Sequence, residues 1–220
     1  MDWTAILLSL ELAACTTFIL CIAGLPIAYW LAVSRWRWKF FIEAVVALPL
    51  VLPPTVLGFY LLMAMGDHSP LGQAFTALTG SQLAFSFTSL LIGSVLFSLP
   101  FAVRPFAVAF AGVDRRLIEA SWCLGVSPLA TFFRITMPLA WVGILNGIIL
   151  SFVHTIGEFG VVLMVGGNIE GRTRTVSLVI YNDVQSLHYA AANQTALVLL
   201  LFSFAALAAT YAWQRRSWVL

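Results

Sequence analysis

Charged side chains are scarce in this sequence of 220 residues. Asp, Glu, Lys and Arg together make up 9% of the chain, whereas a soluble domain carries about 25%. Hydrophobic residues reach 61%, and the mean hydropathy is +0.99. The formal net charge is only +2, and no dense basic cluster indicates nucleic-acid binding. This composition excludes an ordinary soluble domain and predicts an integral membrane protein in contact with lipid.

Motifs of energy-coupling and metal-dependent enzymes are also missing. No glycine-rich loop ends in Lys-Ser or Lys-Thr, so the chain has no Walker motif for ATP. The three cysteines, Cys15, Cys21 and Cys123, and the scattered histidines do not have the spacing of a metal site. We therefore expect no cofactor and no metal in this chain, and no enzyme activity. Any ATP and Mg²⁺ would be bound by a separate subunit.

Five segments contain no Asp, Glu, Lys or Arg at all and are long enough to cross a hydrocarbon core of about 30 Å, which needs about 20 residues. They are 12–33, 44–66, 83–103, 135–157 and 190–213. A sixth apolar run, 159–169, has two adjacent glycines and is too short to cross, so it is interpreted as a re-entrant or interfacial segment. No linker or internal repeat divides the chain. The sequence predicts an all-α membrane protein with five transmembrane helices in one domain, 1–220.

The placement of Lys and Arg predicts the orientation, because cytoplasmic loops are enriched in these residues. One side receives nine of them: Arg35, Arg37, Lys39, Arg104, Arg115, Arg116, Arg134, Arg215 and Arg216. The other side receives only Arg172 and Arg174. We expect the N-terminus outside, the C-terminus in the cytoplasm, and the loop of about 112–134 between the third and fourth spans on the cytoplasmic face.

Prolines interrupt the second span at Pro49, Pro53 and Pro54. Proline removes a backbone donor and clashes with the preceding turn. Backbone carbonyls freed in this way are tolerated in a bilayer only against protein or a water-filled cavity. The broken span is therefore expected to face the centre of the assembly, and the three prolines are candidates for a translocation path or gate. The alternative is that they are packing kinks.

The 112–134 loop has clear local signals. Asp114 is a suitable N-cap for a helix over 115–124, and Gly125 is a typical helix stop because it accepts positive φ. Ser127 and Pro128 then start the next helix as cap and first-turn residue. A short amphipathic helix between two turns is suited to docking in a groove on a partner. An interfacial helix lying on lipid has the same features.

Within this loop, Glu119-Ala120-Ser121, Gly125 and Ile135-Thr136-Met137-Pro138 have a fixed spacing. It resembles the E-A-A, x3, G, x9, I-x-L-P loop of the membrane subunits of bacterial ABC importers, with Ser121 and Met137 as departures. The resemblance implies a cytoplasmic coupling helix that docks into an ATP-hydrolysing subunit. The residues it assigns to coupling are Arg115, Arg116, Glu119, Ala120, Ser121, Gly125, Ile135 and Pro138.

Two further stretches, 48–57 and 157–175, resemble the membrane subunit of molybdate ABC importers, and the resemblance covers nearly the whole chain. It implies a multi-pass permease of the bacterial inner membrane that forms a homodimer. Its expected partners are two cytoplasmic ABC ATPase subunits and an extracytoplasmic oxyanion-binding protein. Sulfate and tungstate importers share the loop, so the identification of molybdate as the transported anion depends on the resemblance alone. A self-standing channel or secondary anion carrier is the alternative from another class.

Glu158 follows the fourth span and is a further candidate at the path or gate. An acidic group beside an anion route is unfavourable for contact with the cargo. We expect Glu158 to hold the 159–169 segment through backbone donors or through an ion pair with Arg172 or Arg174. Arg104 is expected at the cytoplasmic end of the third span, which leaves no cation near mid-membrane. Tight anion binding needs converging cations or helix N-termini, so selectivity is expected in the binding protein.

Overall fold

The computed structural model describes residues 2–217, which form helices joined by short loops and contain no strand. The helices are α1 (Trp3–Val33), α2 (Lys39–Val51), α3 (Pro54–Met65), α4 (Pro70–Thr79), α5 (Phe87–Ala111), α6 (Arg115–Cys123), α7 (Pro128–Thr131), the π-helical turn η1 (Phe132–Thr136), α8 (Met137–Gly157), α9 (Gly160–Gly166), α10 (Val176–Gln185) and α11 (Tyr189–Ser217). The all-helical class expected from the sequence is confirmed.

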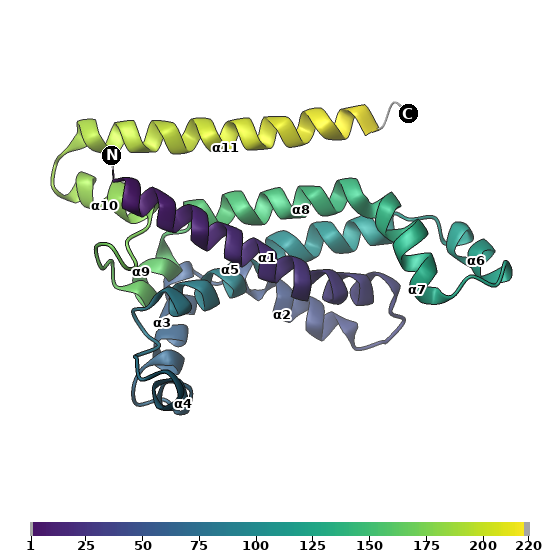
Figure 1. Ribbon diagram of the computed structural model, residues 1–220, viewed down its shortest axis with the longest axis horizontal. Coiled ribbons are helices and arrows are strands. Elements are labelled where there is room, and N and C mark those ends of the chain that lie inside the picture. Colours follow the sequence, from purple (N-terminus) through teal and green to yellow (C-terminus); the bar gives the residue numbers. More distant parts are fainter. Residues whose placement is uncertain (1, 218–220) are drawn as a thin grey trace.

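Three long helices, α1, α5 and α8, form the centre of the bundle (Figure 1). Phe106 of α5 is fully buried between them, together with Ala102 and Val103. Gly147 of α8 allows this close approach, because a Cβ there would lie 2.6 Å from the Phe106 ring. Small residues at such contacts are typical of membrane helices, where close packing replaces the hydrophobic effect as the driving force.

Four helical segments are long and apolar enough to cross a membrane: Trp3–Val33, Phe87–Ala111, Pro128–Gly157 and Tyr189–Ala212. Three of them extend well beyond the expected spans. The side chain of Asp2 caps α1, and a capping box between Ser86 and Ser89 starts α5. The third segment runs through α7, η1 and α8 without a break and is 30 residues long.

The expected span 44–66 is not one helix. It consists of α2 and α3, which are bent by 110° at the break between them. Pro53 and Pro54 explain the break, because neither provides a backbone N–H and Pro54 occupies the first turn of α3. The described chain therefore has four candidate spans, or five if the bent pair is one.

The short helix α9 lies in a second apolar cluster. Val161, Val162 and Val165 are fully buried there, with neighbours from α3 and α5 around them. The 159–169 segment thus contains a helix of seven residues that protein surrounds. By contrast, α11 lies along one side of the bundle (Figure 1), and only 11% of its most apolar window is buried.

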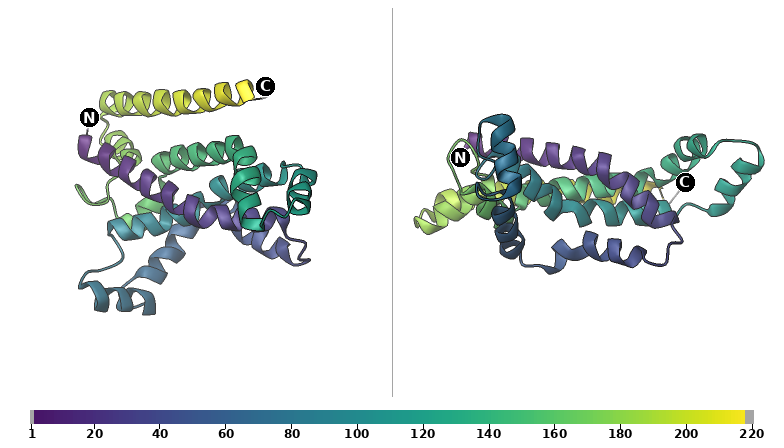
Figure 2. Two further views of the ribbon diagram at one scale, coloured as in Figure 1. Left: turned by 45° about the vertical axis from the view of Figure 1, so that its right-hand side comes forward. Right: turned by 90° about the horizontal axis from the view of Figure 1, so that it is seen from below.

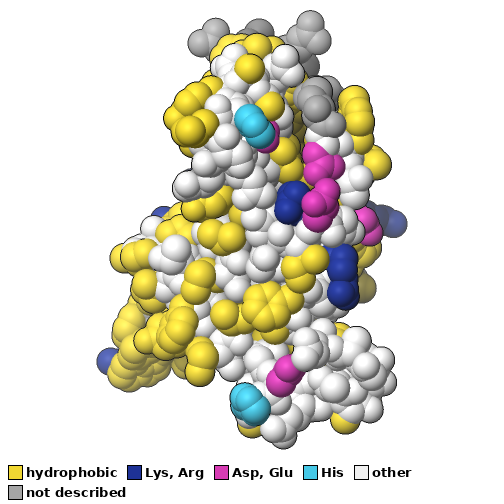
Figure 3. All heavy atoms as spheres, turned by 90° about the vertical axis from the view of Figure 1, so that its left-hand side faces the viewer, with side chains coloured by type: hydrophobic (Ala, Val, Ile, Leu, Met, Phe, Trp, Pro, Cys, Tyr) yellow, Lys and Arg dark blue, Asp and Glu magenta, His cyan; other side chains and the backbone are white. Residues whose placement is uncertain are grey.

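The two ends of the bundle differ in their loops. The loop between α1 and α2, helices α6 and α7, and the C-terminal part of α11 lie at one end, whereas α4, α9 and α10 lie at the other (Figures 1 and 2). The basic loops 34–39 and 112–134 therefore share an end. Figure 3 looks onto the other end, where acidic and basic side chains occur close together.

Candidate functional site

Helix α6 is an exposed helix at one end of the bundle, as Figure 1 shows. The Asp114 carboxylate accepts a hydrogen bond from the Arg116 amide at 2.9 Å and thereby caps the helix. The helix ends before Gly125, whose φ of +78° favours glycine. Leu117 and Trp122 are exposed, and Leu124 is 84% exposed. The caps expected from the sequence are confirmed, and the loop presents apolar side chains to its surroundings.

One buried contact fixes this helix to the next. The Ser121 hydroxyl lies 2.7 Å from the Thr131 hydroxyl, and both side chains are buried. Thr131 donates its one hydroxyl proton to the Ser127 carbonyl at 3.1 Å, so Ser121 is the donor in the pair. The Ile118 carbonyl lies 2.9 Å from the Ser121 hydroxyl and shares its proton. The Ser127 hydroxyl in turn accepts from the Ala130 amide and caps α7. Ser121, a departure from the family pattern, therefore holds α6 against α7.

The residues expected to couple to an ATPase fall into two groups. Arg115, Arg116, Glu119 and Ala120 are exposed on α6, and Arg115 Nε lies 2.8 Å from Glu119 Oε1. Ile135 and Pro138 belong to the following helix instead. Pro138 has no N–H for the carbonyl four residues before it, and the chain forms the π-helical turn Phe132–Thr136 there. The structure thus places Ile135 and Pro138 outside the docking helix.

At the other end of the bundle, the proline break and the segment after α8 come together. A Cβ on Gly160 would lie 2.6 Å from Pro54 Cβ, so the start of α9 is in contact with the start of α3. Pro49 is buried in α2, whereas Pro53 and Pro54 are exposed. Two of the candidate path elements, far apart in the sequence, are therefore neighbours.

Glu158 does not have the partners expected from the sequence. Its side chain is 3% exposed, and neither carboxylate oxygen has a hydrogen-bond partner among the described residues. Arg174 is engaged elsewhere, with Glu170 at 3.3 Å, and Arg172 is exposed. The contact that Glu158 does make uses its main chain and joins it to α10, because the Ser177 hydroxyl donates to its carbonyl at 2.5 Å. Both expected kinds of partner, backbone donors and an ion pair with Arg172 or Arg174, are therefore absent among the described residues, and this prediction is wrong.

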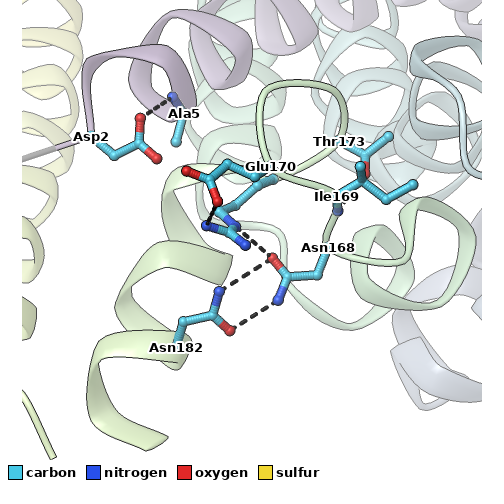
Figure 4. Close-up of polar contacts among 8 residues, drawn as sticks. Asp2, Ala5, Asn168, Ile169, Glu170, Thr173 and Asn182 are labelled. Atoms are coloured by element: carbon cyan, nitrogen blue, oxygen red, sulfur yellow. Dashed lines mark hydrogen bonds and ion pairs between the residues drawn. The ribbon is translucent and has the colours of Figure 1, made fainter. Parts of the chain in front are cut away.

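A compact polar network connects α9 to α10 (Figure 4). Thr173 is buried, donates to the Gly166 carbonyl at 2.6 Å and accepts from the Ile169 amide at 3.0 Å. The Asn168 amide donates to Asn182 at 2.9 Å, and Arg174 Nε donates to Asn168 at 3.1 Å. Sequence reasoning missed Thr173 and Asn182. The one feature of the sequence that could have indicated this network is the run of polar residues directly after Gly166 and Gly167.

His154 makes its contacts within the helix bundle. Its Nδ1 lies 3.0 Å from the Ser98 hydroxyl, and its ring stacks on Phe101 with centroids 3.8 Å apart. Ser98 also contacts Thr155 at 2.9 Å. Among residues 2–217, no group of three His, Cys, Asp or Glu side chains is close enough to hold a metal ion.

Residues 24–219 match the family model for the binding-protein-dependent transport system inner membrane component. The chain belongs to this family. A relative in Azotobacter vinelandii, molybdenum transport system permease protein ModB, is 50% identical over 97% of this chain and 95% of its own length. The protein of the same name in Escherichia coli K12 is 35% identical over 84% of this chain and 81% of its own length.

Solved structures of two ABC transporters have a similar fold. The chain superposes on the inward-facing MetNI methionine ABC transporter with a TM-score of 0.71 at 18% identity, covering 96% of this chain and 94% of the other. A bacterial alginate ABC transporter in complex with an alginate-bound periplasmic protein gives a TM-score of 0.70 at 15% identity, over 97% and 78% of the two chains. The arrangement of the helices in this chain is therefore one that solved ABC transporters also have.

Proposed function

We propose that this permease forms the membrane path of an ATP-driven importer for molybdate. The observation that carries the proposal is the 50% identity to a molybdenum transport permease over almost the full length of both chains. The chain itself performs no chemistry on the cargo. A separate ATPase binds ATP and Mg²⁺ and supplies the energy.

Helix α6 is the docking element for that ATPase. It projects from the bundle, and most of its residues are exposed. Its apolar residues Leu117 and Trp122 are about half exposed, and Leu124, directly after the helix, is largely exposed. The Ser121–Thr131 contact gives α6 a fixed position relative to the long helix that follows. A short amphipathic helix held in this way is suited to a groove on a partner.

The topology we propose has five spans, with the bent pair α2 and α3 as the second. The loops 34–39 and 112–134 carry most Lys and Arg residues and lie on the cytoplasmic side with the C-terminus, so the N-terminus lies outside. Such a chain is a multi-pass protein of the bacterial inner membrane. The α4, α9 and α10 end then faces an extracytoplasmic oxyanion-binding protein.

Two copies of the chain enclose the path, each with one ATPase subunit. The exposed prolines Pro53 and Pro54 and the exposed side chains Tyr60 and Met63 of α3 leave one face of the broken span uncovered. A two-fold dimer that covers this face keeps the freed carbonyls away from lipid.

Transport follows alternating access. ATP binding brings the two ATPase subunits together, their grooves move the α6 helices, and the path closes inward and opens toward the docked binding protein. Shifting a two-state equilibrium almost fully needs a differential affinity of about 5.5 kcal/mol. ATP and the docked binding protein together supply this differential affinity, because each binds one of the two states more tightly than the other.

Sulfate is the second candidate cargo. A relative in Zygnema circumcarinatum, described as a probable sulfate transport system permease protein, is 35% identical over 89% of this chain.

The test of the proposed function is uptake by proteoliposomes that contain the permease, its ATPase and the binding protein, supplied with molybdate, tungstate or sulfate. We expect molybdate to stimulate ATP hydrolysis and to accumulate. Stimulation by sulfate alone would identify a sulfate importer, and uptake without ATPase would indicate a channel or carrier.

A further inference from the structure

Arg104 occupies an unusual place for a cation. The sequence indicates the third span ends before it, but α5 continues for seven more residues to Ala111. Arg104 therefore lies within the candidate span Phe87–Ala111 and not in a loop, and its side chain is exposed. An ionisable side chain in a membrane span is costly and usually has a partner. The ion pairs of the described chain are Lys39–Glu43, Arg115–Glu119 and Arg174–Glu170, so Arg104 has no acidic partner there.

Arg104 lines a cavity of about 450 Å³ between α1, α2 and α5. Lys39 and Glu43 line the same cavity, and its remaining wall is mainly apolar, with Val46, Val103 and Ala107. Two cations and one carboxylate give the lining a formal charge of +1. The cavity lies toward the end of the bundle that carries α6, because its lining residues come from the end of α1, the start of α2 and the second half of α5.

Lys39 is held loosely at this cavity. Its Nζ lies 3.7 Å from Glu43 Oε1 and donates to the Leu31 carbonyl at 3.4 Å. Both contacts are long for a charged donor. The ammonium group thus has donors left for an additional acceptor. Glu43 competes with such an acceptor for Lys39 and repels any anion in the cavity.

We infer that this cavity binds one tetrahedral oxyanion between Arg104 and Lys39. The guanidinium group offers a planar pair of donors that matches two oxygens of such an anion, and Lys39 adds a point charge. The anion is either the phosphate of an anionic phospholipid, with an acyl chain along the apolar wall, or a free oxyanion from the same side of the membrane. Basic pockets between membrane helices bind lipid head groups in this way.

The test uses the full-length chain in nanodiscs of phosphatidylcholine and two separate probes. In the first arm, phosphatidylglycerol is added and the bound lipid is counted by native mass spectrometry. In the second arm, radiolabelled molybdate, sulfate and phosphate are titrated by equilibrium dialysis. The variants are Arg104→Gln, Glu43→Gln and the control Arg35→Gln, which removes a cation from the adjacent loop outside the cavity.

We expect Arg104→Gln to weaken binding of the anion by about tenfold or more, since it removes a charge-assisted pair of hydrogen bonds. Glu43→Gln is expected to tighten binding, which a misfolded variant would not do. Arg35→Gln is expected to leave binding unchanged. Binding in the first arm alone identifies the lipid head group, and binding in the second arm identifies a free oxyanion.

The inference is overturned if neither probe binds the unsubstituted chain, if Arg104→Gln binds as tightly as the unsubstituted chain, or if Arg35→Gln weakens binding equally. It does not rest on molybdate being the cargo. Uptake of molybdate by the unsubstituted importer tests the cargo separately, so the two proposals can fail independently.

Discussion

The hydroxyl groups of Ser121 and Thr131 lie 2.7 Å apart in a buried contact between α6 and α7. Because α6 is otherwise exposed, this pair is the main polar restraint on its position. Thr131 keeps its own acceptor, the Ser127 carbonyl, when Ser121 is replaced. The loss on removing one hydroxyl is therefore about 1 kcal/mol, as for an ordinary hydrogen bond.

Ser121→Ala is expected to loosen α6 without preventing membrane insertion. Amide hydrogen exchange over 115–123, measured by mass spectrometry, should become several-fold faster because local opening costs less. Cys123→Ala is the matched control, since Cys123 is exposed on the same helix. Unchanged exchange in Ser121→Ala would show that the contact does not hold the helix.

Gly125→Val is expected to impair coupling through the backbone alone. A Cβ at Gly125 would meet no atom within 4 Å, so the effect comes from the positive φ of +78°, at a cost of roughly 1 kcal/mol. The variant should reach the membrane in normal amounts, transport poorly and lose ATP hydrolysis stimulated by the binding protein. Gly125→Asn is the control, because Asn tolerates positive φ, and it should keep most activity. Full transport by Gly125→Val would contradict this role.

Glu119→Lys is expected to release the ATPase while leaving the fold intact. The Arg115–Glu119 pair is exposed, and such pairs contribute little to stability. The reversal of charge therefore acts mainly on the contact between α6 and the proposed ATPase subunit. We expect normal amounts of the variant in the membrane and less ATPase recovered with it on purification, with Glu119→Gln intermediate. Equal recovery of the ATPase with the unsubstituted chain, Glu119→Lys and Glu119→Gln would exclude a docking role for this charge.

Gly160→Ala is expected to disturb the contact between α3 and α9. The added methyl group would lie 2.6 Å from Pro54 Cβ, so backbone or ring must shift, and overpacking of this kind costs about 1–3 kcal/mol. The measurement is the melting temperature in detergent, which should fall. Gly157→Ala, three residues earlier and with no atom within 4 Å of the added Cβ, should leave it unchanged. An equal fall in both variants would point to a general effect of the added methyl.

Glu158→Gln is expected to melt at the same temperature as the unsubstituted protein or higher. The carboxyl group is buried without a hydrogen-bond partner among the described residues, and this burial raises its pKa to about 8. It is largely neutral at neutral pH, where the neutral amide should melt at the same temperature, and it buries a charge only above about pH 8, where the amide should melt at a higher temperature. We expect slower transport with the preference between molybdate and sulfate unchanged, because Glu158 borders α9 and we expect the binding protein to determine selectivity. A changed preference would place Glu158 in contact with the cargo.

The features predicted correctly from the sequence are those set by neighbouring residues. Asp114, Gly125 and Ser127 act within a few residues, so their roles as caps and stop follow from local chemistry. The 110° bend after α2 depends on how α3 packs against α9, and only the presence of a break was predictable from Pro53 and Pro54. The partners of Glu158 were predicted wrongly because Arg174 pairs with Glu170 and Asn168 instead. Which of several possible partners an arginine contacts depends on the tertiary structure, and the sequence does not reveal it.

The unbroken helix from Pro128 to Gly157 has a mechanical consequence. Thirty residues at 1.5 Å each form a rod of about 45 Å. One end is joined to α6 through Thr131, and the other continues directly into Glu158 and α9. A tilt of about 10° around the α6 end would displace the far end by about 8 Å, more than the rise of one helical turn. In the proposed mechanism, a small rotation imposed by an ATPase would thereby be amplified at the opposite face of the membrane, beside the proline break.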